Sequence, residues 1–381
     1  NTRNWELYFI GSDHDMSELN SKVGKEAQYK RQDENRSNIL SILFIIYLAN
    51  CKGKNEFKIA WLVPVLILPI FGIGLYFIYK TNLGGHKLNQ SIKDEEQKSA
   101  KYLKQLPDSE GAKSLYPKMK DIASYLENNG NFPCYTNSPI KYFPSGELFF
   151  TDIIEELNKA QKFIFLEYFI IEEGELWDEI HSLLVKKAGE GVEIRLLFDD
   201  VGCMKTLPRT FDGALSAEGI SARRFARVSA RLSSVHHNRD HRKILVMDGI
   251  CAYTGGINLA DEYINELERF GYWMDCAAIV KGDAVKSFLA MFCSTWEFTT
   301  GKAIDMSAHL SEEKILNKGF LLPYADGPLD NKNPAEGIYM QIINSAQRYV
   351  YIATPYLIID NSMKECLRLA AKSGIDVRII T

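Results

Sequence analysis

The sequence predicts an α/β protein: a mixed sheet flanked by helices, duplicated with an incomplete second copy, and preceded by an N-terminal transmembrane segment. Three observations lead to this fold class. Strand-like apolar segments alternate with helix-length amphipathic segments after residue 146. The same order of segments begins again about 183 positions later, and a long uncharged apolar run precedes both copies.

Composition narrows the class of protein. The chain has 381 residues, of which 46% are hydrophobic and 25% charged, a balance typical of folded proteins. Its formal net charge of −4 argues against a general nucleic-acid binder, so we predict no nucleic-acid partner. The seven cysteines include no CxxC pair, so neither a disulfide framework nor a zinc site is expected.

The apolar run covers residues 59–79, carries no charge and is long enough to cross a hydrocarbon core of about 30 Å. Trp61 near one end and Tyr79 at the other are typical of membrane interfaces, so we predict a transmembrane helix. The shorter apolar segment 39–49 is either part of a first helix or an interfacial segment. The anchor is therefore expected to be single-pass or multi-pass, and lysines are balanced around the run, so the positive-inside rule does not decide its orientation.

The predicted domain organisation follows these changes of pattern. A polar segment (1–38) precedes the membrane anchor (39–80), a juxtamembrane stalk (81–137), a first sheet domain (138–310) and the start of a second one (311–381).

Within the first sheet domain, the hydrophobic periodicity predicts each element in turn. The helices are expected at 147–160, 176–188 and 283–296, and the strands at 163–171, 192–198, 243–254 and 276–280. Helices between strands predict crossover connections and a largely parallel or mixed sheet.

The second copy is visible as a repeat of this order. NKAQKFIFLEYFI at 158–170 matches NSAQRYVYIATPYLI at 344–358, and AGEGVEIRLLFDD at 188–200 matches AAKSGIDVRIIT at 370–381. We interpret the repeat as a duplicated domain. The counterpart of position 241 would then fall near position 424, beyond Thr381.

The chemical signal is the motif HRKILVMDG, with His241, Lys243 and Asp248. Residues two apart on a strand share one side, so His241 and Lys243 are expected to face one pocket, as a nucleophile or base beside a cation. Such a pair suits a phosphoryl group, because the cation stabilises negative charge on the non-bridging oxygens. Asp248, an odd number of positions beyond Lys243, is expected to face away and to support the segment.

The residues that follow complete the predicted site. The Asn258 amide is a candidate for binding phosphate oxygens with Lys243. Gly255 and Gly256 either allow a close backbone approach or form a plain turn. A neutral imidazole can then form a phosphohistidine, and a second histidine is the natural acid for the leaving group. His236 and His237 line the entrance or lie in an exposed loop.

HxKxxxxD followed by GGxN resembles the signature of the phospholipase D superfamily, and the surrounding stretches resemble bacterial cardiolipin synthases. These stretches are FPSGE (143–147), LEYFII (166–171), VEIRLLFDDVG (192–202), TGGINLADEYI (254–264), FGYWMD (270–275) and TPYLI (354–358). The resemblance implies a phospholipase D-like fold in which two half-domains form one site, without metal or cofactor. It also implies a phosphatidyltransferase that converts two phosphatidylglycerol molecules into cardiolipin and glycerol.

The resemblance assigns His241, Lys243 and Asp248 as catalytic residues and Asn258, Gly255 and Gly256 as substrate-binding residues. It implies phosphatidylglycerol and membrane lipid as partners, and a bacterial cell membrane location with the catalytic domain in the cytoplasm. The second half-site is expected from a missing C-terminal part or from another chain.

Two other hypotheses remain open at this point. One is a phospholipase D-type phosphodiesterase, a lipid hydrolase or nuclease, that acts as a single-motif homodimer. The other is a catalytically silent fragment. The sequence departs from the family pattern at Asp240, where the family usually has Asn.

Overall fold

The computed structural model describes residues 13–51, 55–81, 101–102, 117–227, 239–313, 315–326 and 333–381. The chain divides into two compact units, Asn1–His86 and Lys87–Thr381. Each unit is described by itself.

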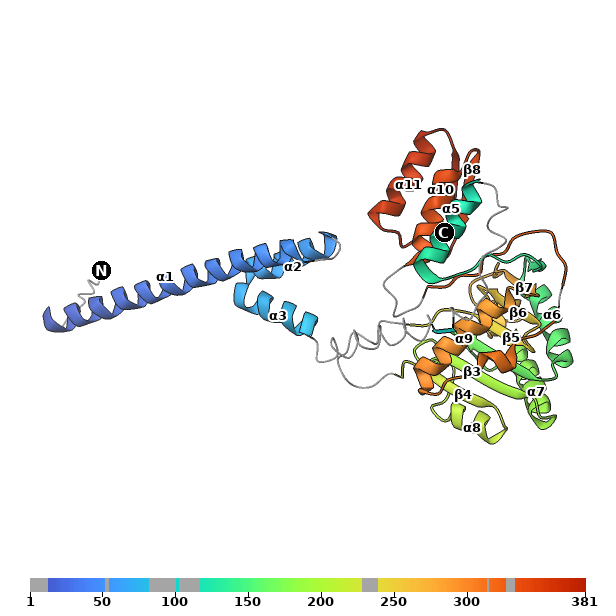
Figure 1. Cartoon of the computed structure of the whole chain (residues 1–381). Helices are drawn as coiled ribbons and strands as arrows, with labels where there is room; N and C mark the ends of the chain where they lie inside the picture. Colours follow the sequence, from blue (N-terminus) through green and yellow to red (C-terminus); the bar gives the residue numbers. More distant parts are fainter. Residues whose placement is uncertain are drawn as a thin grey trace, which may run out of the picture. The chain divides into compact units, whose positions relative to one another are not determined.

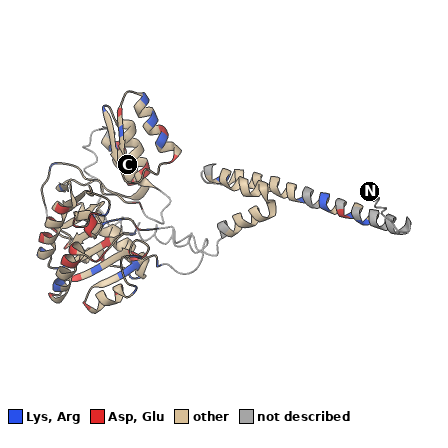
Figure 2. Ribbon diagram, turned by 180° about the vertical axis from the view of Figure 1, so that it is seen from behind, with Lys and Arg blue, Asp and Glu red and all other residues tan. Residues whose placement is uncertain are grey.

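The described residues of the first unit form three helices, α1 (Asp13–Asn50), α2 (Asn55–Ile67) and α3 (Pro69–Thr81). Its small core contains Phe44 and Tyr76, whose rings meet edge to face at 4.9 Å. Figure 2 shows that the end of α1 and most of α3 carry no charged side chains. Apolar side chains such as Ile59 and Ile70 are nevertheless exposed.

The single spanning helix predicted for residues 59–79 is corrected to two shorter helices of 13 residues each. They are separated at Leu68, directly before Pro69, which has no amide proton to continue the helical hydrogen bonds. A Cβ at Gly72 would lie 2.5 Å from the Pro64 carbonyl oxygen, so the two helices approach closely at this glycine. Among the residues that the structure describes, no helix combines the length and the apolar character that crossing a bilayer requires.

The described residues of the second unit form a seven-stranded sheet in the order β1-β7-β6-β5-β2-β3-β4. The strands are β1 (Ile140–Phe143), β2 (Phe163–Tyr168), β3 (Glu193–Asp199), β4 (Ser221–Phe225), β5 (Ile244–Met247), β6 (Cys251–Gly255) and β7 (Ala277–Lys281). Strands β2, β3 and β4 pair in parallel, and the remaining pairs are antiparallel. The predicted mixed α/β class is therefore confirmed.

Helices cover both faces of this sheet, as Figure 1 shows. Helices α6 (Gly146–Lys159) and α7 (Glu175–Gly189) pack on one face, and α9 (Val285–Thr300) packs on the other; α8 (Phe211–Ala217) lies beside β4. Successive β2 side chains alternate between the two cores, with Leu166 toward α6 and α7 and Phe165 toward α9.

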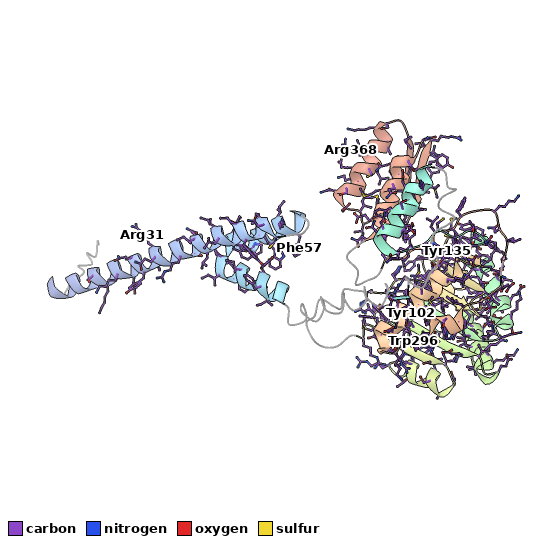
Figure 3. The ribbon with its side chains drawn as sticks, in the orientation of Figure 1. Arg31, Phe57, Tyr102, Tyr135, Trp296 and Arg368 are labelled. Carbon is purple, nitrogen blue, oxygen red and sulfur yellow. The ribbon has the colours of Figure 1, made fainter. Side chains whose placement is uncertain are left out.

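The α9 face is further covered by aromatic side chains from distant parts of the chain (Figure 3). The Tyr102 hydroxyl donates a hydrogen bond to the Glu297 carboxylate at 2.7 Å. The Tyr135 hydroxyl lies 2.9 Å from Ser287 Oγ on the same helix. These contacts tie the start of the second unit to α9.

The strand predicted for residues 243–254 is in fact a hairpin of β5 and β6. The turn contains Asp248 at φ +55° and Gly249 at φ +69°. A tight hairpin turn requires positive φ, and Asp-Gly is a typical sequence for it. The apolar residues on both sides made the segment look like one continuous strand, whereas the Asp-Gly pair was the signal for the turn.

The C-terminal part contains α10 (Pro334–Ser345), β8 (Tyr349–Ala353), α11 (Asn361–Lys372) and β9 (Asp376–Ile380). This order repeats α6, β2, α7 and β3. The parallel pairing begins at Phe163 opposite Glu193 in the first copy and at Tyr349 opposite Asp376 in the second. Helix α5 (Pro117–Gly130) packs against α10. The domain boundaries at 81–137, 138–310 and 311–381 stay predictions.

Candidate active site

His241 and Lys243 lie side by side just before β5. The Lys243 ammonium lies 3.2 Å from His241 Nδ1 and donates a hydrogen bond to the His241 carbonyl oxygen at 2.7 Å. The two residues precede the strand because the pairing of β2 with β5 ends at Glu167 opposite Ile244. Lys243 is buried, whereas His241 is exposed, so the imidazole is the accessible member of the pair.

Phe169 forms an apolar wall beside this pair. Its ring centroid lies 4.7 Å from that of His241, and the Lys243 ammonium lies 5.5 Å from the same phenyl ring. Phe169 directly follows β2, which runs antiparallel to β5. The sequence reasoning missed this residue, although an aromatic residue at the end of a buried strand was available as a signal.

Burial and charge determine the protonation of the pair. Partial desolvation of its ring lowers the pKa of His241, the Lys243 charge lowers it further, and the Asp240 carboxylate partly opposes both. Burial lowers the pKa of Lys243 to about 8, against the opposing charges of Asp240 and Asp275. At neutral pH the arrangement therefore favours a neutral imidazole beside a protonated ammonium group.

Asp248 lies at the opposite end of β5 from His241. Its carboxylate accepts hydrogen bonds from the backbone amides of Gln161, Lys162 and Phe163 at 2.7, 2.8 and 2.9 Å. The carboxylate thereby holds the hairpin turn against the start of β2. The structure thus does not bring Asp248 together with His241 and Lys243.

Asn258 is buried, and both ends of its amide have partners. The side-chain oxygen accepts a hydrogen bond from the Ile170 amide at 3.0 Å, and Nδ2 donates to the Tyr263 hydroxyl at 2.7 Å. Binding a phosphate oxygen through Nδ2 would require this second bond to be exchanged. Tyr263 is a further polar group of the region that the sequence reasoning missed.

The two glycines allow close approaches at the end of β6. A Cβ at Gly255 would lie 2.4 Å from the Cys276 carbonyl oxygen, and one at Gly256 would lie 2.1 Å from Asp275 Oδ1. Gly256 therefore makes room for the Asp275 carboxylate. Because Asp275 acts electrostatically on Lys243, this glycine helps to shape the charge around the pair.

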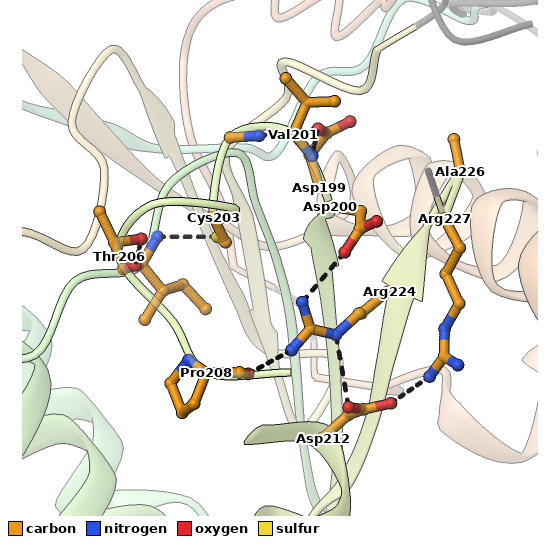
Figure 4. Close-up of polar contacts among 12 residues, drawn as sticks. Asp199, Asp200, Val201, Cys203, Thr206, Pro208, Asp212, Arg224, Ala226 and Arg227 are labelled. Atoms are coloured by element: carbon orange, nitrogen blue, oxygen red, sulfur yellow. Dashed lines mark hydrogen bonds and ion pairs between the residues drawn. The ribbon is translucent and has the colours of Figure 1, made fainter. Parts of the chain in front are cut away.

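The carboxyl end of β3 is fixed by a second polar region, drawn in Figure 4. Asp199 is buried and accepts hydrogen bonds from the amides of Val201 and Gly202 at 2.8 and 3.0 Å. Arg224 binds Asp200 at 3.0 Å, Asp212 at 3.3 Å and the Pro208 carbonyl oxygen at 2.6 Å. We refer to Arg224 and these three partners as the Arg224 cluster.

Two further histidines precede the motif in the sequence, where no metal site is predicted. His236 and His237 lie outside the described residues. Within the parts of the chain that the structure describes, no group of three His, Cys, Asp or Glu side chains is arranged to hold a metal ion.

Comparison with known families defines the class of protein. Residues 153–295, which include His241 and Lys243, match the family described as cardiolipin synthase, phospholipase D-like domain. Residues 39–79 match the family described as phospholipase D-nuclease N-terminal. The chain therefore contains a phospholipase D-like domain.

Similar sequences narrow this class. A cardiolipin synthase of Geobacillus sp. (strain WCH70) is 32% identical over 350 residues, which are 90% of this chain and 68% of that protein. A protein of Streptococcus mutans described as uncharacterized is 41% identical over 346 residues, 88% of this chain and 73% of that one. The chain belongs to the cardiolipin synthase family, as the motif predicted.

The matches to solved structures are more distant in sequence. Phosphatidylserine synthase from Haemophilus influenzae Rd KW20 is 15% identical, with a TM-score of 0.45, over 68% of this chain and 65% of that one. Nuc from Salmonella typhimurium, a phospholipase D family member, is 17% identical, with a TM-score of 0.31, over 42% of this chain and 93% of that one.

Proposed function

We propose that this chain carries one half-site of a phosphatidyltransferase that joins two phosphatidylglycerol molecules into cardiolipin and glycerol through a phosphohistidine at His241. The observation that carries the proposal is the Lys243 ammonium 3.2 Å from Nδ1 of an accessible imidazole. Membership of the cardiolipin synthase family supports the choice of a phospholipid as substrate.

The hydrogen bond between the pair constrains the first step. An ammonium group only donates, so Nδ1 accepts and the proton of the neutral ring lies on Nε2. For Nε2 to attack phosphorus, the ring must change to the tautomer with its proton on Nδ1. A phosphate oxygen can then replace Nδ1 as a partner of Lys243, while the His241 carbonyl oxygen keeps its bond.

The chemistry balances over two displacements. The Nε2–P bond forms as the bond from phosphorus to the glycerol headgroup oxygen breaks, and an acid protonates the departing alkoxide. That acid, now deprotonated, takes the proton from a hydroxyl of the second phosphatidylglycerol, whose oxygen attacks phosphorus as the N–P bond breaks to give cardiolipin. One phosphodiester replaces another, so the proposal includes no nucleotide or other cofactor.

We assign the protonating group to the second half-site, in the continuation of the repeat that starts with α10 or in another chain. The reaction belongs at a membrane surface, because both substrates reside in the bilayer. The apolar side chains exposed on the first unit fit a lipid environment.

The test uses the intact protein and vesicles of phosphatidylglycerol labelled in the headgroup. We expect labelled glycerol and cardiolipin, both abolished by His241→Ala. His181→Ala is the matched control, because His181 lies on α7 and pairs with Glu218 at 2.7 Å. Undiminished cardiolipin formation by His241→Ala would overturn the proposal, and phosphatidic acid in place of cardiolipin would favour the hydrolase hypothesis.

A further inference from the structure

A buried group of polar side chains lies behind the segment that carries His241 and Lys243. We refer to Asp240, Arg242, Glu167 and Thr295 as the Arg242 cluster. Arg242 Nε lies 2.9 Å from Asp240 Oδ1 and 3.0 Å from Glu167 Oε1. Arg242 Nη2 donates a hydrogen bond to Thr295 Oγ1 at 2.6 Å. Glu167 and Asp240 are only 1% and 4% exposed, so both carboxyl groups are buried, whereas Arg242 is partly exposed.

The cluster joins three elements of the sheet domain. Glu167 belongs to β2, Thr295 belongs to α9, and Asp240 and Arg242 lie in the segment directly before β5. Removing one partner of a buried charge pair strands the other charge, so such a cluster strongly favours one arrangement. The segment before β5 is thereby fixed where the ladder between β2 and β5 has already ended.

Successive side chains of this segment point to opposite sides of the chain, so the attachment of one side also orients the other. Residues 240 and 242 turn toward the cluster, while His241 and Lys243 turn toward Phe169. Each of the two residues of the proposed half-site is therefore next to a residue with a fixed side chain.

We propose that the Arg242 cluster positions His241 and Lys243, and that Asp240 supplies the fixed negative charge beneath them. Asp240, Arg242, Glu167 and Thr295 are positioning residues in this proposal, since they act through the pair. The inference rests on the proposed function for its kinetic test, and its spectroscopic test does not need activity.

The electrostatics of the cluster agree with this geometry. Burial alone would raise the pKa of Asp240, but the Arg242 charge and hydrogen bonds with Glu167 and Arg242 bring it below its usual value. Asp240 is therefore the carboxylate of the cluster that carries negative charge next to the pair. The charged groups facing the pair are then Asp240 toward both residues and Asp275 toward Lys243.

The kinetic test compares pH profiles of kcat/KM for the intact protein and its Asp240→Asn variant. Asparagine keeps an acceptor oxygen for Arg242 and removes the charge. Because Asp240 raises the pKa of both His241 and Lys243, we expect both limbs of the profile to move to lower pH. Asp275→Asn should move only the basic limb, which belongs to Lys243. Asp212→Asn, in the separate Arg224 cluster, is the matched control and should move neither limb.

Substitutions at two further positions test positioning without changing the charge of the pair. Thr295→Val removes the acceptor of Arg242 Nη2 and should lower kcat by about 10- to 100-fold with little change in KM, because misplaced catalytic groups lose rate. Glu167→Gln keeps an acceptor oxygen for Arg242 and Thr295 and should retain the wild-type limbs, because Asp240 and Asp275 are the carboxylates that act on the pair. Glu167→Ala removes the acceptor and should lose activity. These variants keep the test decisive if Asp240→Asn does not fold.

The spectroscopic test follows the His241 ring by nitrogen NMR, with His241→Ala to assign its signal. We expect the His241 imidazole to titrate at lower pH in Asp240→Asn than in wild type. An unchanged titration, or unchanged limbs and kcat in Asp240→Asn and Thr295→Val, would overturn the positioning role. Cardiolipin formation by His241→Ala would instead overturn the proposed function, so the two failures are distinguishable.

Discussion

The two copies of the α-β-α-β unit have the same local structure in different surroundings. In the first copy the Arg195 guanidinium lies 5.3 Å from the Phe165 ring, and at the equivalent positions Arg378 lies 5.2 Å from the Tyr351 ring. Each arginine also pairs with the acidic residue two positions earlier, Glu193 or Asp376. The pairing of the parallel strands and the contacts across it therefore follow from the local sequence.

Burial differs sharply between the copies. Every residue of β2 is buried, whereas Tyr349 and Tyr351 of β8 are 56% and 55% exposed. Strand β2 lies between β3 and β5 under helices on both faces, while β8 pairs with β9 in the described part of the chain. The repeated sequence therefore specifies the local α-β-α-β structure, whereas the neighbouring strands and helices bury the side chains of its first strand.

The largest expected effect comes from truncating equivalent aromatic residues in the two copies. Phe165 is fully buried and stacks on Phe292 at 4.9 Å, so Phe165→Ala should lower the free energy of unfolding by about 3–5 kcal/mol. Tyr351→Ala should cost about 1 kcal/mol or less, because its ring is exposed. Denaturant unfolding measures both costs. Equal losses of unfolding free energy in the two variants would show that burial by neighbouring elements does not set the contribution of these aromatic residues.

A smaller difference is expected for two carboxylates that accept backbone hydrogen bonds. Asp248 accepts three amides, and Asp248→Ala should cost about 2–4 kcal/mol because buried donors lose a charged acceptor. Asp360 caps α11 by accepting the Met363 amide at 3.0 Å, and Asp360→Ala should cost about 1 kcal/mol. Thermal unfolding compares the two, with Asp248→Asn expected to retain part of the stability.

The sequence predicted most of the first sheet domain because periodicity is local information. Helices α6, α7 and α9 and strands β2 and β3 begin and end close to the predicted positions. The prediction of one continuous helix over residues 59–79 was wrong because hydropathy ignores the break before Pro69. The short strands β1 and β4 were missed because neither has a long apolar pattern.

Local periodicity likewise predicted only part of the candidate site. Alternation in an extended segment was enough to expect His241 and Lys243 on one side of the chain. It could not show that Asp248 serves the far end of β5, because its partners lie about 86 positions earlier. Phe169 and Glu167 reach the region through the pairing of β2 with β5, which a single sequence does not reveal. Tyr263 reaches Asn258 from a 3-10 helix, Asp261–Ile264.

The smallest expected effect concerns Glu193, which begins β3, and its equivalent Asp376, which begins β9. In the first copy, His309 binds Glu193 at 3.0 Å, and its other ring nitrogen lies 2.8 Å from the Asp305 carbonyl oxygen. The hydrogen bond with Glu193 is the main cause that raises the pKa of His309 above 6.5, and the bond with His309 is the main cause that lowers the pKa of Glu193 below 4.5.

The pH dependence of stability follows from these two directions. The contribution of His309 is complete below pH 6.5 and is lost as the pH rises through its folded-state pKa. The contribution of Glu193 is present above pH 4.5 and is lost as the pH falls through its folded-state pKa. His309→Asn should therefore lower the free energy of unfolding most between pH 4.5 and 6.5, by about 1 kcal/mol or less for this partly exposed pair, and less toward pH 8. In the second copy Asp376 pairs with Arg378, which keeps its charge, so the cost of Asp376→Asn should not change between pH 6 and 8. If His309→Asn lowered the free energy of unfolding equally at pH 6 and pH 8, His309 would not make the two copies differ in the pH dependence of their stability.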